Sequence, residues 1–321
     1  MIRKARPIWQ ELPDHFKTDV VKILDFKSRC CLKICSGSDQ ILVKSCSNNF
    51  KTVVISPPDK LELDHKIYTC SGIDQLISLV IHIFEHPKSS AKQIEFNFDR
   101  RNEPENVQFF LETFLCCLKA NMKNIKFKCR VFNYQEYHNR ILEDHFLKVL
   151  QLFDSKHLIE INLSSAISSD FIEKVCASEQ WKNAKKLKIM GHFDYDFPIE
   201  HFLHFNRIII KNIRSLSAEK SCKFIENFLN KNPSKGSMFT LETDIPLLID
   251  EILPKLPNEW QGGTYLMNLP QYVHSRVYDM KDPKLKLVLK FERDAILGAV
   301  CDEQWMEADF RWSVYRCRMD W

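Results

Sequence analysis

The chain has 321 residues, of which 45% are hydrophobic, so it can bury a sizeable core and is longer than one typical domain. Its 46 basic residues barely outnumber its 42 acidic residues, and a net charge of +4 does not by itself indicate a nucleic-acid-binding protein. Only seven Gly residues occur, and neither GxGxxG nor GxxxxGK(S/T) is present, which argues against enzymes with the common nucleotide-binding loops.

Neither a targeting segment nor a metal-binding pattern is evident. No apolar run follows the basic residues 1–7, and the longest apolar stretch, residues 76–84, is too short to span a bilayer. The twelve Cys residues contain no CxxC pair, and close ones such as Cys30 and Cys31 fall in predicted apolar helices. We therefore expect reduced, mostly buried thiols, no metal or cofactor, and a soluble intracellular protein of the cytoplasm or nucleus.

The N-terminal segment, residues 7–38, predicts short helices separated by a break. Leu12 and Pro13 precede apolar residues at helical spacing, among them Phe16, and a second short apolar helix follows residues 25–28 and passes through Ile34 and Cys35. A segment of fewer than about 40 residues buries too little surface to offset its chain entropy. These helices must therefore pack on another part of the protein.

A connector precedes the main body of the chain. Residues 41–56 alternate as in a hairpin, with Asn48 and Asn49 at its turn, and Pro57 and Pro58 end it. We assign residues 41–70 to this hairpin and connector.

From residue 71 onward the apolar period switches repeatedly between helical and extended spacing. The predicted helices are followed by predicted strands at residues 93–98, 125–129, 158–163, 186–190, 207–211 and 238–241. Their central residues lie 21 to 34 positions apart and are Ile94, Ile125, Ile159, Leu187, Ile208 and Phe239. We predict an α/β fold in which residues 71–260 form a curved solenoid of irregular βα repeats, similar in architecture to a leucine-rich repeat although the LxxLxLxxN consensus is absent. A doubly wound sheet is the alternative, but the Gly-rich first turn that its ligand site usually needs is missing.

The C-terminal part predicts one more helix and then strands. A helix begins after Asp244, Ile245 and Pro246. Residues 285–291 and 311–318 predict strands, and we expect residues 261–321 to cap the solenoid.

The N-terminal pattern resembles an F-box of the divergent nematode type. The residues that carry the likeness are Leu12, Pro13, Val20, Val21, Ile23, Leu24, Leu32, Cys35, Ser36 and the run 25–29. The likeness spans residues 7–40 and implies docking to the Skp-family adaptor of cullin–RING ubiquitin ligases. Residues 38–40 stand in place of the usual Trp-Arg finish, which would weaken that contact. The alternative is an amphipathic helical hairpin that closes one end of the domain.

A second resemblance covers residues 110 to 250. The run EQWKNAKKL at residues 179–187 is similar to the FTH domain, which accompanies F-boxes in a large nematode family. From the residues themselves, we expect Trp181 to cover the turn into the strand at Leu187.

Together the two resemblances imply a non-catalytic substrate-recognition subunit of an SCF-type cullin–RING E3 ubiquitin ligase. The F-box would dock the Skp-family adaptor and the solenoid would bind a target protein through residues that the sequence does not identify. The expected adaptor contacts are Leu12, Pro13, Val20, Val21, Ile23, Leu24 and Leu32.

Other interpretations of the chain remain open. A degenerate F-box would leave an interaction scaffold outside the ligase system. His201 and His204, near Asp194 and Asp196, suggest a metal-dependent enzyme, although a structural role beside neighbouring Phe residues is favoured.

Nucleic-acid binding has two weaker signals. A helix-turn-helix over residues 16–36 would offer only Arg29 and Lys33 to a DNA groove. A C-terminal run combines basic and aromatic residues, namely Arg311, Trp312, Tyr315, Arg316, Arg318 and Trp321. Such residues could stack on nucleic acid or bind a partner, but a half-buried terminal strand is the favoured interpretation.

Overall fold

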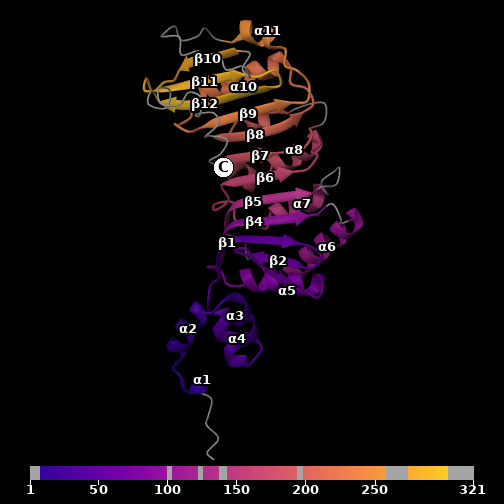
Figure 1. The fold of residues 1–321 in the computed structure, drawn as a ribbon, viewed down its shortest axis with the longest axis vertical. Coiled ribbons are helices and arrows are strands. Elements are labelled where there is room, and N and C mark those ends of the chain that lie inside the picture. Colours follow the sequence, from indigo (N-terminus) through magenta and orange to yellow (C-terminus); the bar gives the residue numbers. More distant parts are fainter. Residues whose placement is uncertain are drawn as a thin grey trace, which may run out of the picture.

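The fold is an elongated α/β structure with a helical module at one end. We describe it from a computed structural model, and the described residues are 8–99, 103–121, 126–136, 143–193, 198–256 and 274–302. The four N-terminal helices are α1 (Ile8–Glu11), α2 (Asp14–Ile23), α3 (Phe26–Lys33) and α4 (Gly37–Lys44). Figure 1 shows these helices, which we call the N-terminal module, below the rest of the molecule.

One twelve-stranded sheet runs through the rest of the described chain. Its strands are β1 (Asn49–Ser56), β2 (Lys60–Leu63), β3 (Lys66–Thr69), β4 (Ser90–Phe98), β5 (Cys129–Glu136), β6 (Glu160–Ser164), β7 (Lys186–Ile189), β8 (Arg207–Ile213), β9 (Met238–Thr243), β10 (His274–Asp279), β11 (Leu285–Phe291) and β12 (Ala295–Asp302). From β1 through β4 to β9 the strands are parallel neighbours in chain order. Antiparallel strands complete both edges, β2 and β3 beside β1, and β10 to β12 beside β9.

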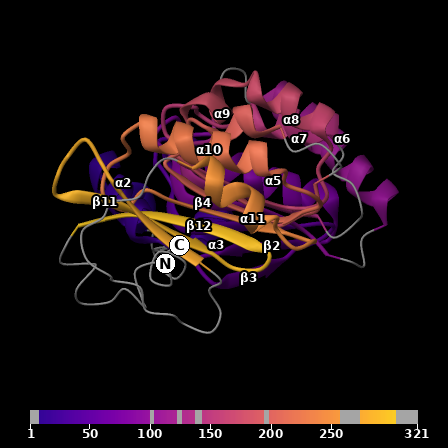
Figure 2. The same ribbon diagram turned by 90° about the horizontal axis from the view of Figure 1, so that it is seen from above.

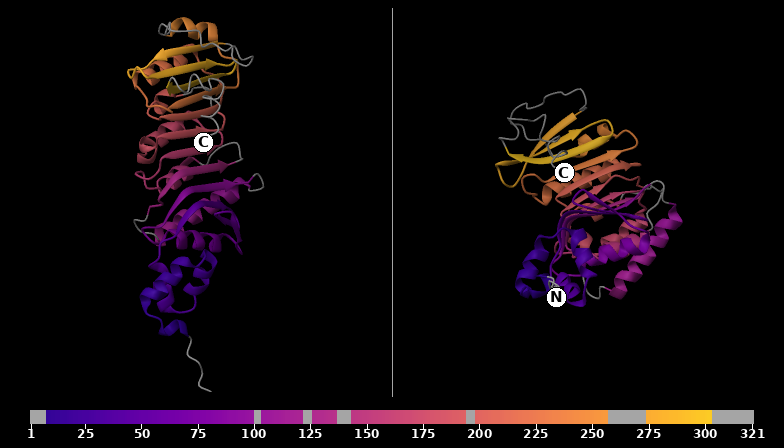
Figure 3. Two further views of the ribbon diagram at one scale, coloured as in Figure 1. Left: turned by 60° about the vertical axis from the view of Figure 1, so that its left-hand side comes forward. Right: turned by 60° about the horizontal axis from the view of Figure 1, so that its bottom comes forward.

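Helices connect the parallel strands. They are α5 (Ile73–Phe84), α6 (Pro104–Asn121), α7 (Glu143–Leu150), α8 (Ser169–Cys176), α9 (Glu179–Asn183), a 3-10 helix (Ile199–Phe202) and α10 (Ala218–Asn230), and α11 (Ile249–Ile252) with a 3-10 helix (Leu253–Lys255) follows β9. Figure 2, viewed from above, shows α6 to α10 on one side of the strands, and Figure 3 shows the strands stacked along the molecule. A doubly wound sheet needs parallel strands on both sides of its switch point and helices on both faces. Here β2 and β3 beyond β1 are antiparallel and α6 to α10 lie on one side, so that alternative is wrong.

The main core lies between this sheet and its helices. Alternate strand residues such as Ile94, Phe96 and Phe98 are fully buried and belong to one continuous cluster with the apolar faces of the helices. Aromatic rings bridge successive repeats, as where Phe132 and Phe153 lie 4.4 Å apart between ring centroids. Neighbouring strands and helices therefore share one continuous apolar core.

Serine side chains begin several of the helices. The Oγ atoms of Ser168, Ser178 and Ser217 accept the backbone N–H three residues further on, at 3.1, 3.3 and 3.2 Å. Ser168 is thus the N-cap of α8. Trp181 is also buried as expected, and its indole Nε1–H donates to the carbonyl of His201 at 3.1 Å.

Most of the predicted strands match observed ones, but two assignments are wrong. Residues 125–129 do not form the second strand, because β5 begins at Cys129, and Ile125 itself lies outside the described residues. Residues 41–44 are not a hairpin strand but the last turn of α4, which Ser36 caps, and the turn after β1 falls at residues 57–59. Alternating apolar residues in short stretches fit both states, and tertiary packing decides between them.

The C-terminal strand at residues 285–291 is confirmed as β11, and the last predicted helix as α11. The predicted strand at 311–318 and the basic aromatic run with it lie outside the described residues. Within the described ranges, no helix combines the length and apolar character needed to cross a bilayer.

Candidate functional site

The N-terminal module has a small core of its own. Val21, Val43 and Cys46 are buried together, and Trp9 and Leu32 pack against them. The Trp9 indole also donates to the Asp39 carboxylate at 2.9 Å. The main sheet contributes nothing to this cluster, so the module is a separate packing unit attached to the end of the sheet.

Local sequence explains the module's four short helices. Pro13 precedes α2, the Asp25 carboxylate accepts the Ser28 amide at 2.8 Å to begin α3, and Ser36 Oγ accepts the Asp39 amide at 3.1 Å to begin α4. The same hydrogen bond lowers the pKa of Asp25 below its ordinary value. These caps break the segment into helices too short to stand alone.

Large apolar side chains cover the outside of the module. Phe16, Ile23, Ile34 and Ile41 are 55%, 82%, 85% and 72% exposed. Phe16 and Ile23 lie seven residues apart on α2, so they share one helix face with half-buried Val20 between them. Single exposed apolar residues are common on protein surfaces, but Phe16 and Ile23 together form an apolar stripe on α2 that is suited to a protein partner.

The predicted adaptor contacts divide into two groups in the structure. Val21 is fully buried and Leu32 packs on the same small core, so both support the module from inside. Ile23 and Pro13 are exposed, whereas Leu12, Val20 and Leu24 are half-buried. The role of all seven in adaptor binding stays a prediction.

Sequence reasoning did not assign three exposed residues to the site. Phe16 was placed in the apolar helical pattern, but Ile34 and Ile41 were assigned to a helix interior and a hairpin strand. The spacing of Phe16 from Ile23 was the available signal for α2, since both lie opposite the core residue Val21. Ile41 could be found only after α4 was recognised as a helix.

An aromatic contact joins the module to the sheet. Phe26 at the start of α3 is buried in the main core rather than in the module. Its ring packs edge-on against Phe50 of β1 and Tyr68 of β3, with centroids 5.9 and 5.8 Å apart, and lies 5.6 Å from the ring of His82 in α5. This side chain ties α3 to three elements of the sheet domain.

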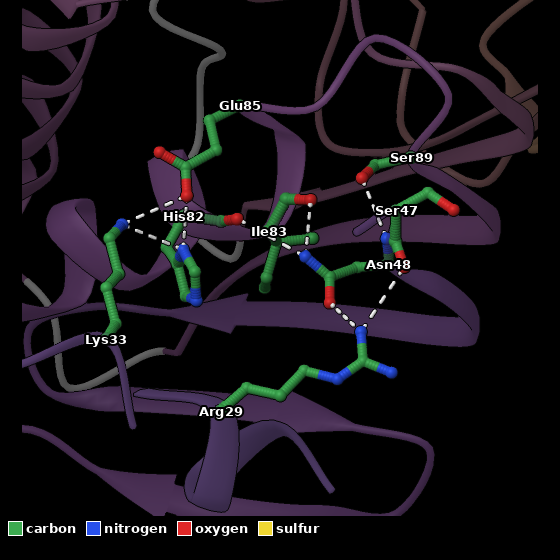
Figure 4. Close-up of polar contacts among 8 residues, drawn as sticks. All are labelled: Arg29, Lys33, Ser47, Asn48, His82, Ile83, Glu85 and Ser89. Carbon is green, nitrogen blue, oxygen red and sulfur yellow. Dashed lines mark hydrogen bonds and ion pairs between the residues drawn. The ribbon is translucent and has the colours of Figure 1, made fainter. Parts of the chain in front are cut away.

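Arg29 and Asn48 form the polar part of the junction (Figure 4). The Arg29 guanidinium donates to the Asn48 side-chain oxygen at 3.0 Å and to the Ser47 carbonyl at 3.3 Å. The buried Asn48 amide in turn donates to the carbonyls of His82 and Ile83 at 3.3 and 3.2 Å, in the last turn of α5. The carbonyls at the end of a helix lack intrahelical partners. Asn48 therefore supplies hydrogen-bond donors to two carbonyls of α5 and, with its side-chain oxygen, accepts a hydrogen bond from Arg29.

A second polar contact lies beside it. Lys33 Nζ is 2.9 Å from both His82 Nδ1 and Glu85 Oε1, and His82 Nδ1 is 2.5 Å from the same carboxylate oxygen. Burial alone would raise the pKa of Glu85, but hydrogen bonds from His82 and Lys33 and their charges outweigh it, so the pKa is lowered. With Arg29, Asn48 and Phe26, this cluster fixes the module against the sheet. We call these residues the junction.

At the alternative site around His201 and His204, the contacts of His204 are those of a histidine that packs within the fold. His204 Nε2 lies 2.9 Å from the Trp181 carbonyl, and its ring centroid is 3.9 Å from that of Phe205. Burial, followed by nearby Lys231 and Lys185, lowers the pKa of His204 against the opposing effect of that hydrogen bond. Asp194 and Asp196 lie outside the described residues, and within those residues no group of three His, Cys, Asp or Glu is placed to hold a metal ion.

Comparison with known proteins identifies one domain. No curated protein matches the chain. The family model of the FTH domain matches residues 108–253, from α6 to the start of the 3-10 helix after α11, as the likeness around residues 179–187 predicted. The described part of the N-terminal module and strands β10 to β12 lie outside that match. Residues 108–253 of this chain are thus similar to the FTH domain.

Proposed function

We propose that the chain is a substrate-recognition subunit of an SCF-type cullin–RING E3 ubiquitin ligase. The N-terminal module, as a divergent F-box, docks the Skp-family adaptor, and the sheet domain, as a leucine-rich-repeat-like solenoid, binds a target protein. The FTH match supports this proposal because that domain accompanies F-boxes. The subunit itself is non-catalytic, and a separate enzyme transfers ubiquitin to a lysine of the bound target.

The exposed apolar surface of the module carries the proposal. A module of four short helices that leaves Phe16, Ile23, Ile34 and Ile41 in water has apolar surface to bury against a partner. Buried apolar anchors at the centre of an interface typically cost about 2 kcal/mol or more when removed, which is about thirtyfold in affinity. Of the predicted contacts, Ile23 is a large apolar side chain that is 82% exposed, and it is the best candidate for such an anchor.

The junction supports the same function in another way. Ubiquitin transfer depends on holding the target lysine near the catalytic enzyme at a high effective concentration. A freely jointed module would spread the target over many positions. Phe26, Arg29 and Lys33 instead bind α3 to the sheet domain through buried apolar and polar contacts.

The test is binding of the purified full-length chain to a purified Skp-family adaptor, measured by calorimetry. The variant Phe16→Asp/Ile23→Asp places two charges on the exposed face of α2. The control Phe109→Asp/Ile245→Asp makes the same substitutions at side chains that are 60% and 52% exposed in the sheet domain. We expect at least thirtyfold weaker binding by the α2 variant and unchanged binding by the control, with both variants folded as judged by circular dichroism.

Two results would contradict parts of this proposal. If the unmutated protein does not bind the adaptor, the ligase function fails and the interaction scaffold with a degenerate F-box becomes the better account. If the α2 variant binds as tightly as the control, the adaptor contact lies elsewhere on the module.

A further inference from the structure

A groove crosses the sheet domain on four neighbouring parallel strands. It has a volume of about 590 Å³ and is lined by residues at or beside β4, β5, β6 and β7. Its lining contains four cationic side chains, Lys92, Arg130, Lys186 and Lys188, and one carboxylate, that of Glu160. The lining therefore carries three net positive charges, on a chain whose total net charge is only +4. This concentration of positive charge indicates a site for an anionic ligand.

Side-chain amides donate hydrogen bonds to the carboxylate of Glu160 in the lining and to that of Glu95 beside it. Asn162 Nδ2 donates to Asn133 Oδ1 at 2.8 Å and to Glu160 Oε1 at 2.9 Å, and Asn133 Nδ2 donates to Glu95 Oε2 at 3.1 Å. Lys186 Nζ lies 3.6 Å from the Glu160 carboxylate. Both carboxylates are thus engaged with groups of the sheet itself.

The other three cations lack such engagement. Among the residues that the structure describes, no carboxylate lies within ion-pair distance of Lys92, Arg130 or Lys188. The cross-strand register places Lys188 beside Asn162, and Asn162 beside Asn133, so cations and amide groups share one surface. Such a surface can offer ion pairs to acidic side chains and hydrogen bonds to a peptide backbone.

We propose that this groove binds an acidic segment of the target, rich in Asp and Glu, in an extended conformation. The inference rests on the proposed function in that it names the part of the target that the sheet domain recognises. Neighbouring strands lie about 4.8 Å apart, so the groove spans about 14 Å, which is the length of about four extended residues. A short cluster of carboxylates therefore matches the groove in charge and in length.

Single-stranded RNA fits the lining less well. The described lining contains no aromatic side chain on which a nucleic-acid base could stack. The observations thus favour an acidic peptide over single-stranded RNA, and the phosphoserine peptide in the test below separates carboxylates from phosphates.

The test is fluorescence anisotropy of the full-length protein with a labelled peptide of alternating Glu and Gly residues. Comparison ligands are the same peptide with Gln in place of Glu, a phosphoserine version and oligouridylate RNA. The groove variant is Lys92→Gln/Lys188→Gln. Its control, Lys119→Gln/Lys148→Gln, removes the same charge from exposed positions on α6 and α7, on the other side of the sheet.

We expect the unmutated protein to bind the Glu peptide more tightly than the Gln peptide. The groove variant should bind the Glu peptide about tenfold more weakly than the unmutated protein does, and the control variant should bind it equally well. Binding of the Glu peptide should also weaken as salt is added. Equal binding of the Glu and Gln peptides, equal affinity of the two variants, or tighter binding of the phosphoserine peptide or RNA would each overturn the inference.

Adaptor binding separates this inference from the proposed function. The groove variant should bind the Skp-family adaptor like the unmutated protein, because its substitutions leave the N-terminal module and the junction intact. Loss of peptide binding with adaptor binding retained assigns the effect to the groove. If the unmutated protein fails to bind the adaptor, the peptide measurements still decide whether the groove recognises acidic segments.

Discussion

Removal of the Asn48 side chain is the sharpest test of the junction. In Asn48→Ala, the carbonyls of His82 and Ile83 each lose a donor, and Arg29 loses one acceptor. The change lies in a buried position, since Asn48 is 6% exposed, so water cannot fully replace the lost bonds. Phe26 and the contacts of Lys33 remain, and the module should stay folded but be held less firmly.

The expected magnitude follows from these three hydrogen bonds. The two to the α5 carbonyls are long, at 3.2 and 3.3 Å, and we assign each about 0.5 kcal/mol, the lower end of the usual range. The bond from the charged Arg29 adds about 1.5 kcal/mol, again the lower value, because the guanidinium keeps the carbonyls of Ser47, Leu24 and Lys22. The junction should lose about 2 to 3 kcal/mol.

Hydrogen exchange measured by mass spectrometry reports this loss locally. Exchange protection of peptides from α3 and α5 should fall by about thirtyfold or more in Asn48→Ala. The control is the same substitution one residue later, Asn49→Ala, where an exposed side chain accepts one hydrogen bond from Ser90 at 2.9 Å. If the two variants show the same protection in α3 and α5, the reasoning about the junction is wrong.

Two further predictions concern the ionisation of Glu85 and the packing of Gly191. The lowered pKa of Glu85 means that its carboxylate stabilises the fold above the ordinary value of 4.5, and this contribution disappears as pH falls through the lower folded value. Glu85→Gln should therefore melt at a lower temperature than the unmutated protein at pH 7 but equally at acidic pH; a pH-independent difference would contradict this. A Cβ on Gly191 would overlap the backbone of Ser165, whereas one on Gly37 meets nothing within 4 Å. In thermal melts, Gly191→Ala should cost about 3 kcal/mol or prevent folding and Gly37→Ala should be neutral, and equal melting temperatures would refute the packing argument.

The helix–strand alternation was predictable because it depends on local apolar period. Helices such as α5 and α10 carry a continuous buried stripe, and their strands follow at once. The second strand was misplaced for a physical reason. Phe127 and Cys129 are buried two residues apart, but the next buried pair, Phe132 and Tyr134, has the opposite phase, so the alternation breaks inside the segment. Period alone cannot show on which side of such a break the strand lies.

The candidate site was less predictable than the fold. From the helical pattern, Ile23 and Val21 were both predicted to contact the adaptor, although Ile23 is exposed and Val21 is fully buried. A short helix with apolar residues on most sides has no single apolar face, so the pattern does not show which residues point outward. The junction pairs Arg29 with Asn48 and Lys33 with Glu85, across 19 and 52 positions of sequence. Contacts of this kind depend on how the module packs on the sheet, and no local pattern encodes them.

The strand order sets the distance between the N-terminal module, to which we assign adaptor binding, and the groove, to which we assign target binding. The junction attaches α3 to β1 through Phe26 and Phe50 and to the end of α5 through Asn48, and the groove begins on β4, the parallel neighbour of β1. At about 4.8 Å between strands, β7 at the far side of the groove lies about 19 Å from β1. A target held in the groove would therefore sit near the module rather than at the distant edge formed by β10 to β12. The strands from β1 to β7 share one continuous core, so the buried junction is the point that decides whether this separation stays fixed.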